Sequence, residues 1–196
     1  MRKDQELLSE LVAQKSHTLD LGCGDGELFE FLAKQKQITG YCVEIDPKKI
    51  VKSVDRGINC IQKDLNDGLG YLSADSFDLV IMAQSLQQLK HPEKMIEEMM
   101  RISKQAIVTF PNFGHWTTRF YLGLRGKMPM SEALPHKWYD TPNIHLCTFI
   151  DFEALCLSLN IKVKKRLVVN ENYESTWRLK LWPNFFGEIA IYHLER

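Results

Sequence analysis

Thr18-Leu19-Asp20-Leu21-Gly22-Cys23-Gly24-Asp25-Gly26 joins an apolar, strand-like run (His17–Leu21) to an amphipathic, helix-like run that ends near Lys36. Three glycines between a strand and a helix allow the backbone to take positive φ angles and to approach a ligand closely, because no Cβ stands in the way. A turn in this position is typical of nucleotide-binding α/β proteins. The stretch therefore predicts a nucleotide site at the end of the first strand.

The spacing of the glycines distinguishes two kinds of ligand. A dinucleotide fingerprint, G-x-G-x-x-G, would place its third glycine at position 27, but position 27 is Glu and the third glycine is Gly26. Asp20, Asp25 and Glu27 would surround the helix N-terminus, where they would repel a pyrophosphate. S-adenosylmethionine (SAM) carries a sulfonium and an ammonium and no phosphate. The turn thus favours SAM, with a predicted site that includes Asp20, Gly22, Gly24 and Gly26.

Two carboxylates end the second predicted strand, Ile38–Ile45, about 20 residues after the turn, where an acidic side chain would accept both ribose hydroxyls. Asp46 precedes Pro47, which is the pattern of a helix N-cap followed by proline at the first helical position. We therefore assign the ribose contact to Glu44. The alternative, that Glu44 is a solvated charge at the end of a strand, stays open on the sequence alone.

Strand-like and helix-like runs alternate along residues 17–110, which predicts an α/β fold with a mostly parallel sheet covered on both faces. The pattern stops at residue 111 and resumes near Asp151, the expected N-cap of a later helix. Strands are expected near 161–170 and 187–193. Residues 1–196 are expected to form a single domain, since no linker, repeat or low-complexity tract interrupts them.

Residues 15–110 resemble the class I SAM-dependent methyltransferase fold. The resemblance implies a three-layer, Rossmann-like sheet that is mostly parallel with an antiparallel last strand. It also implies that Asp64 receives the adenine amino group, that Ile45 and Leu65 pack on the base, and that Ala83 and Gln84 lie beside the methionine moiety. For Asp64, a role as a turn residue before a short helix is an open alternative.

Composition excludes several classes of protein. Lys plus Arg equals Asp plus Glu at 25 each, and this balance argues against a nucleic-acid partner. No apolar run is long enough for a membrane span, and none follows the first residues as in a secretory signal. The five cysteines include no C-x-x-C pair, which favours reduced thiols in a cytoplasmic protein. No cysteine or histidine spacing indicates a metal site.

Residues 111–149 form an aromatic-rich stretch without periodicity, longer than the usual connection of about 4–6 residues. We expect an ordered lid that packs its aromatic side chains over the nucleotide pocket and the carboxyl ends of the strands. It would also carry the surface for a small-molecule substrate or a protein partner. The residues assigned to that surface are His115, Trp116, His136, Trp138, Tyr139, Asn143 and His145.

Two runs in this stretch are specific. Pro111-Asn112-Phe113-Gly114-His115-Trp116 and Trp138-Tyr139-Asp140-Thr141-Pro142-Asn143-Ile144-His145, together with the glycine turn, resemble the methionine-biosynthesis protein MetW family over nearly the whole chain. The resemblance implies a SAM- or S-adenosylhomocysteine-binding protein that acts with a homoserine O-acyltransferase in methionine biosynthesis.

No residue is assigned to catalysis. The Asn/Asp-Pro-Pro-aromatic pattern of amino-methylating members of the fold is absent, and the corresponding stretch is Ala83-Gln84-Ser85-Leu86. A methyltransferase that acts on a small-molecule acceptor is the alternative function, because an activated sulfonium methyl needs little more than a well-placed acceptor.

Overall fold

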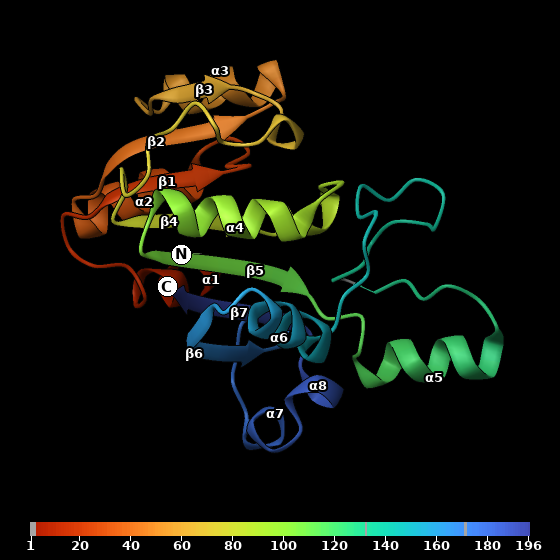
Figure 1. The fold of residues 1–196 in the computed structure, drawn as a ribbon. Coiled ribbons are helices and arrows are strands. Elements are labelled where there is room, and N and C mark those ends of the chain that lie inside the picture. The colour runs from red at the N-terminus through yellow and green to blue at the C-terminus, as the bar shows by residue number, and fades with distance from the viewer. Residues whose placement is uncertain (1–2, 132, 171) are drawn as a thin grey trace.

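A seven-stranded sheet forms the centre of the computed structural model, which describes residues 3–131, 133–170 and 172–196 (Figure 1). Its strand order is β3-β2-β1-β4-β5-β7-β6. Strands β1 to β5 pair in parallel, whereas β7 is antiparallel to both β5 and β6. The predicted mostly parallel sheet with an antiparallel last strand is therefore confirmed. The strands are β1 (His17–Leu21), β2 (Thr39–Glu44), β3 (Cys60–Gln62), β4 (Leu79–Ala83), β5 (Gln105–Pro111), β6 (Lys162–Val169) and β7 (Ile189–Glu195).

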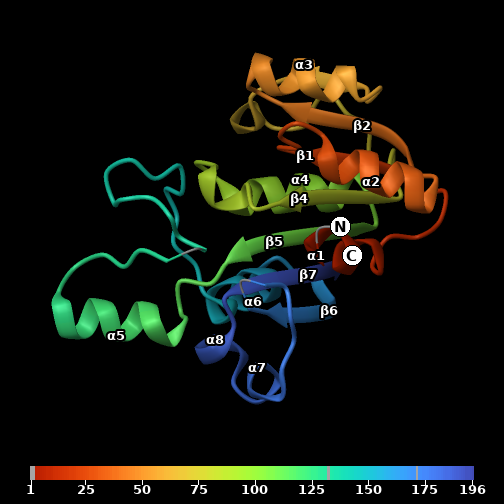
Figure 2. The same cartoon turned by 180° about the vertical axis from the view of Figure 1, so that it is seen from behind.

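Helices cover both faces of the sheet, as Figures 1 and 2 show from opposite sides. Helices α1 (Lys3–Ser9) and α2 (Glu27–Lys36) pack on one face, and α4 (Pro92–Ile102) and α6 (Phe149–Ser158) pack on the other. Helix α3 (Pro47–Asp55) contacts β2 and β3. The remaining helical segments are η1 (Leu65–Asp67), η2 (Leu86–Gln88), α5 (Trp116–Arg125), α7 (Trp177–Leu181) and α8 (Pro183–Phe186).

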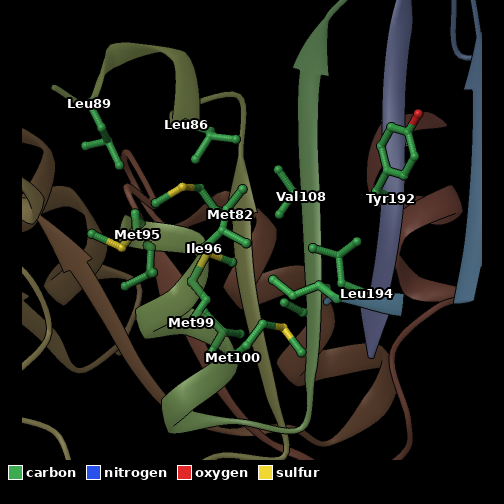
Figure 3. Packing of buried hydrophobic residues seen from close by; sticks show 14 of the residues in the cluster. Met82, Leu86, Leu89, Met95, Ile96, Met99, Met100, Val108, Tyr192 and Leu194 are labelled. Atoms are coloured by element: carbon green, nitrogen blue, oxygen red, sulfur yellow. The ribbon is translucent and has the colours of Figure 1, made fainter. Parts of the chain in front are cut away.

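The core beneath α4 is built from a stripe of methionines. Met95, Met99 and Met100 are buried and lie on the sheet side of the helix, near Met82 and Val108 (Figure 3). This spacing is helical, and it joins α4 to the sheet through apolar contacts. The stripe is therefore part of the core and presents no binding surface.

The strand order creates a switch point between β1 and β4. From β1 the chain moves outward through β2 to β3, and it then returns to the other side of β1 as β4. In open α/β sheets, ligands bind beyond the carboxyl ends of the strands at such a point. The glycine turn follows β1 and lies at this position. Within the described part of the chain, no helix is both long and apolar enough to cross a bilayer.

Helix α6 begins earlier than the sequence predicts. Its N-cap is Thr148, whose hydroxyl accepts a hydrogen bond from the backbone N–H of Asp151 (3.3 Å), while the Asp151 carboxylate accepts one from the N–H of Thr148 (3.0 Å). The two residues form a reciprocal capping box. Asp151 is therefore the third residue of the helix, because Phe149 is buried and extends the helix by one turn.

We expect Thr148→Ala to lower the free energy of unfolding by about 1 kcal/mol, since the first N–H groups of α6 lose an acceptor. Urea denaturation followed by circular dichroism measures this. Ser158→Ala is the matched control, because the Ser158 hydroxyl lies at the other end of α6 and donates only to the Leu155 carbonyl (2.8 Å). Equal destabilisation by the two variants would contradict the assigned cap.

Candidate functional site

The glycine turn is fixed by backbone geometry. Gly22, Gly24 and Gly26 have φ angles of +72°, +61° and +78°. The N–H of Gly22 donates to the Val43 carbonyl of β2 (2.8 Å). A Cβ at Gly22 would lie 2.9 Å from the Ser85 side chain, so the turn also packs closely against the segment that follows β4.

Gly26 packs against neighbouring elements of the fold. It is absent from the lining of the cavities described below. A Cβ at this position would lie 2.7 Å from Ile58 and 2.9 Å from the Ser53 hydroxyl. Gly26 therefore allows the start of α2 to pack closely against Ser53 of α3 and against Ile58, which lies between α3 and β3.

Glu44 is the structural link between the turn and the end of β2. Its side chain is buried, and its carboxylate accepts hydrogen bonds from the N–H groups of Gly24 (2.9 Å), Ile45 (2.9 Å) and Asp46 (3.0 Å). This rules out a solvated strand-end charge. The Asp46 carboxylate accepts from the Lys48 N–H (2.9 Å), as expected for the N-cap of α3.

Asp20 is the other carboxylate beneath the turn. It is 2% exposed, and its Oδ1 has no hydrogen-bond partner among the described protein atoms. Burial, and secondarily the nearby charge of Glu44, raise the pKa of Asp20 to about 7. A buried carboxyl with a strongly raised pKa and an unsatisfied oxygen is typical of a ligand site.

Two cavities flank the turn, with volumes of about 220 Å³ and 390 Å³. Gly22, Ala83 and Gln84 line both, so the cavities meet across the turn and the end of β4. Every residue predicted for the nucleotide site except Gly26 lines one or both. Those on the smaller cavity are Asp20, Gly22, Gly24, Ala83 and Gln84, and those on the larger are Gly22, Glu44, Ile45, Asp64, Leu65, Ala83 and Gln84.

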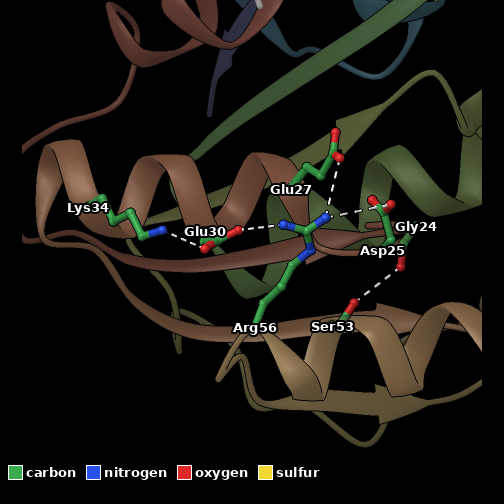
Figure 4. A network of polar contacts seen from close by, with 7 residues as sticks. All are labelled: Gly24, Asp25, Glu27, Glu30, Lys34, Ser53 and Arg56. Carbon is green, nitrogen blue, oxygen red and sulfur yellow. Dashed lines mark hydrogen bonds and ion pairs between the residues drawn. The ribbon is translucent and has the colours of Figure 1, made fainter. Parts of the chain in front are cut away.

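The smaller cavity is acidic. Its described lining includes Asp4, Asp20, Asp25 and Glu27 and no lysine or arginine. Arg56, at the end of α3, partly offsets this charge from outside the cavity: it lies 3.9 Å from Asp25 and 3.3 Å from Glu27 (Figure 4). Such partly exposed ion pairs are weak, so a cation is still the ligand that the cavity favours.

Asp64 is a turn residue before a short helical segment, and it also lies on the larger cavity. Its Oδ1 accepts from the backbone N–H of Asn66 (2.8 Å) and from the Asn66 amide (2.9 Å), which caps η1. It also lines the larger cavity beside Leu65.

Sequence reasoning missed Tyr173 and helix α1, both of which line the smaller cavity. The Tyr173 hydroxyl lies 2.9 Å from the Gln84 side-chain amide nitrogen, and both residues have positive φ (+58° and +55°). Lys3 and Glu174 form an ion pair of 2.6 Å, which ties α1 to the loop after β6. No sequence pattern signals these contacts, because they join segments far apart in the chain.

The aromatic stretch does not have the predicted arrangement. No described residue of 111–149 lines either of the two cavities, and the side chains of Trp138 and Tyr139 are mostly exposed. Helix α5 leaves the sheet at the end of β5 and stands apart from the other elements in both overall views (Figures 1 and 2). The aromatic side chains of this stretch therefore do not line the pocket, and those of Trp116, Phe120, Trp138 and Tyr139 are exposed.

The predicted surface residues lie in two groups. His115 and Trp116 begin α5, where His115 lies 2.7 Å from the Thr117 hydroxyl and 3.6 Å from Glu188, and burial lowers the pKa of His115. The second group, His136, Trp138, Tyr139, Asn143 and His145, lies in the loop after α5. The backbone N–H of His145 donates to the Gln87 carbonyl (3.1 Å), which attaches this loop to η2. Across the described residues, no cluster of three or more His, Cys, Asp or Glu side chains could hold a metal ion.

A family model described as "Methionine biosynthesis protein MetW" matches residues 2–194. The chain belongs to this family. The resemblance inferred from the glycine turn and the two aromatic runs is therefore confirmed.

Relatives of this MetW-family chain extend beyond it. The "Bifunctional methionine biosynthesis protein MetXA/MetW" of Rhodopirellula baltica is 30% identical over 202 residues, which cover 98% of the chain and 32% of the relative. "Ajmaline N-methyltransferase" of Rauvolfia serpentina is 25% identical over 171 residues, which cover 83% of the chain and 58% of that enzyme. The chain thus spans about a third of the length of the R. baltica relative and somewhat over half of the length of the R. serpentina enzyme.

The fold of the MetW-family chain is that of class I methyltransferases. A solved structure titled as an S-adenosylmethionine-dependent methyltransferase from Mesorhizobium loti superimposes with a TM-score of 0.71, covering 99% of this chain and 98% of that one at 12% identity. At that identity the likeness establishes the fold alone.

The raised pKa of Asp20 has a consequence for stability. The pKa of Asp20 is about 7 in the folded chain, whereas in the unfolded chain the carboxyl has its ordinary pKa of 3.8. The unfolded state therefore binds fewer protons between these values, and Asp20 lowers stability as pH rises through this window. We expect Asp20→Asn to stabilise the ligand-free chain at pH 7.5 by an amount on the order of a few kcal/mol.

Urea denaturation at pH 5 and pH 7.5 measures this effect. The difference in the free energy of unfolding between variant and wild type should be smaller at pH 5 than at pH 7.5. Unfolding free energies that stay parallel across this range would contradict a buried, uncompensated carboxyl at position 20.

Proposed function

We propose that the chain binds SAM or S-adenosylhomocysteine across the two cavities. The adenosine would occupy the larger cavity, with Glu44 at the ribose and Ile45, Asp64 and Leu65 around the adenine. The methionine end would extend past Gly22 and Ala83 into the acidic cavity. There Asp20 would face the ammonium group and Gln84 would lie beside the methionine chain.

One observation carries this proposal: the unpartnered, buried carboxylate of Asp20 in an acidic cavity beside the glycine turn. A buried charge without a partner is costly, and an ammonium would satisfy both its charge and its free oxygen. A pyrophosphate at the same place would face four carboxylates. The shared fold with a structure titled as a SAM-dependent methyltransferase supports the same ligand.

The biological role follows from the family. The chain belongs to a methionine-biosynthesis family, and the R. baltica relative combines two named parts, MetXA and MetW, in one polypeptide. We propose that the chain acts in the cytoplasm with a homoserine O-acyltransferase and supports its activity. The SAM concentration would then reflect the supply of methionine, the product of the pathway. SAM would change the activity of the acyltransferase by binding with unequal affinity to two states of the complex.

A second candidate function is methyl transfer to a small molecule. Gln84, Tyr173 and Thr109 place polar groups on the cavity that would receive the methionine end, and the R. serpentina relative is named as an N-methyltransferase. These groups could orient an acceptor beside the sulfonium methyl, which is the main requirement for this reaction.

For SAM binding we expect Glu44→Gln to raise the Kd at least tenfold, because the amide cannot accept all the hydrogen bonds that the carboxylate accepts from backbone and ribose. Isothermal titration calorimetry with SAM, S-adenosylhomocysteine and NAD measures this. Asp46→Asn is the matched control, since it removes a charge from the same cavity and preserves the N-cap. Its Kd should change less than about threefold. Unchanged affinity in Glu44→Gln would refute the ribose assignment.

To separate the two functions, we expect the purified chain to increase the rate of the homoserine O-acyltransferase of the same organism, with a dose-dependent response to SAM. Incubation with SAM and a metabolite extract should release no S-adenosylhomocysteine above the level seen with heat-denatured chain. Release of that product, with no effect on the acyltransferase, would instead favour the methyltransferase.

A further inference from the structure

All four tryptophans of the chain are on its surface. Trp116, Trp138, Trp177 and Trp182 are 41%, 73%, 70% and 63% exposed. Tryptophan is highly buried on average, and it is enriched at the centres of protein–protein interfaces. Among the described residues, twenty large apolar side chains are exposed, and ten of them lie within residues 116–146. The surface of this segment therefore differs from the rest of the molecule.

Helix α5 carries an apolar stripe on the side that faces away from the body. Trp116, Phe120 and Leu124 follow one another at intervals of four residues and so share one face of the helix. Phe120 and Leu124 are 53% and 81% exposed, and the Trp116 and Phe120 rings are in T-shaped contact at 6.3 Å. The one buried residue of α5, Thr118, lies on the opposite face.

This helix has little support within the chain. It is ten residues long, and Figures 1 and 2 both show it apart from the sheet and the other helices. A helix of this length is marginal in water unless an apolar face is packed against something. Its apolar face is exposed here, so a partner that covers Trp116, Phe120 and Leu124 would stabilise both the helix and the complex. An apolar stripe with this spacing is the recognition pattern of a helix that docks in a groove.

Two cations of the same segment lie over aromatic rings outside the stripe. The Arg125 guanidinium lies over the Tyr121 ring at 5.1 Å, and Lys137 lies over the Tyr139 ring at 5.6 Å. Over residues 111–149 the sequence has four Lys or Arg against two Asp or Glu. A complementary partner would therefore present an apolar groove with acidic side chains at its rim.

The identity of the occupant follows from the relatives and rests on the proposed function. The R. baltica relative joins a MetXA part to the part that this chain matches, and the match covers only 32% of its length. Two parts in one polypeptide are held at high effective concentration, which is an advantage for parts that work in contact. We propose that the Trp116–Phe120–Leu124 stripe of α5 docks in an apolar, acidic-rimmed groove of the homoserine O-acyltransferase.

The docking surface is separate from the ligand cavities. None of Trp116, Phe120 and Leu124 lines either of the two cavities beside the glycine turn. Substitutions in the stripe should therefore leave SAM binding unchanged, and a loss of partner binding would not be a secondary effect of ligand loss.

The test compares two triple variants of the full chain. Trp116→Ala, Phe120→Ala and Leu124→Ala together remove the stripe while alanine preserves helix propensity. The control combines Val51→Ala, Val54→Ala and Leu157→Ala, which remove comparably exposed apolar side chains (59%, 55% and 79%) from α3 and α6. Affinity for the acyltransferase of the same organism is measured by calorimetry, and SAM affinity is measured in parallel.

We expect the stripe variant to lose at least a hundredfold in affinity for the acyltransferase and to bind SAM as the wild type does, whereas the control changes less than threefold. Arg125→Glu should weaken the complex and reduce its salt dependence. A stripe variant with wild-type affinity would overturn the docking surface and leave the proposed function intact. If the wild-type chain forms no complex with the acyltransferase, the proposed function is overturned, and the docking assignment is overturned with it. If the wild-type chain forms a dimer that the stripe variant does not form, and the affinity for the acyltransferase is the same for both, the stripe binds a second copy of this chain.

Discussion

Two carboxylates at the ends of adjacent strands, Asp20 on β1 and Glu44 on β2, determine what the glycine turn can bind. Glu44 accepts three backbone N–H groups and fixes the turn against β2. Asp20 lies beneath the same turn, buried and with one oxygen unpartnered, and the charge of Glu44 adds to the effect of burial on its pKa. One carboxylate is thus structural and the other is free to meet a cation. The smaller cavity is acidic because Asp20 lies there together with Asp4, Asp25 and Glu27, and this charge disfavours a diphosphate.

Much of this site could be predicted from local sequence. The choice of Glu44 over Asp46 followed from a capping rule, because a residue before proline at a helix start already has a use for its carboxylate. The glycine spacing distinguishes the turn from a dinucleotide fingerprint, and the acidic lining of the smaller cavity is consistent with that distinction. Both inferences depend on the backbone within a few residues, where sequence and geometry are closely coupled.

The features that sequence reasoning missed depend on distant segments. Gly26 is required because Ser53 and Ile58 approach it, Arg56 reaches Asp25 and Glu27 from α3, and Tyr173 reaches Gln84 across 89 positions of the chain. The position of α5 also could not be predicted, since residues 111–149 have no periodicity that indicates which face is covered. The chain thus has a candidate ligand site built mainly from its first half and an exposed aromatic surface built from its second.

The most direct test of a cation-binding Asp20 is the number of protons released when SAM binds. Titration calorimetry at pH 6 in buffers of different ionisation enthalpy gives this number. Asp20 is mostly protonated at that pH in the free chain, and an ammonium beside it would lower its pKa, so release should approach about one proton per SAM bound. Asp20→Asn should bind more weakly and abolish this release. Tight binding without proton release, or the same release from Asp20→Asn, would contradict the account.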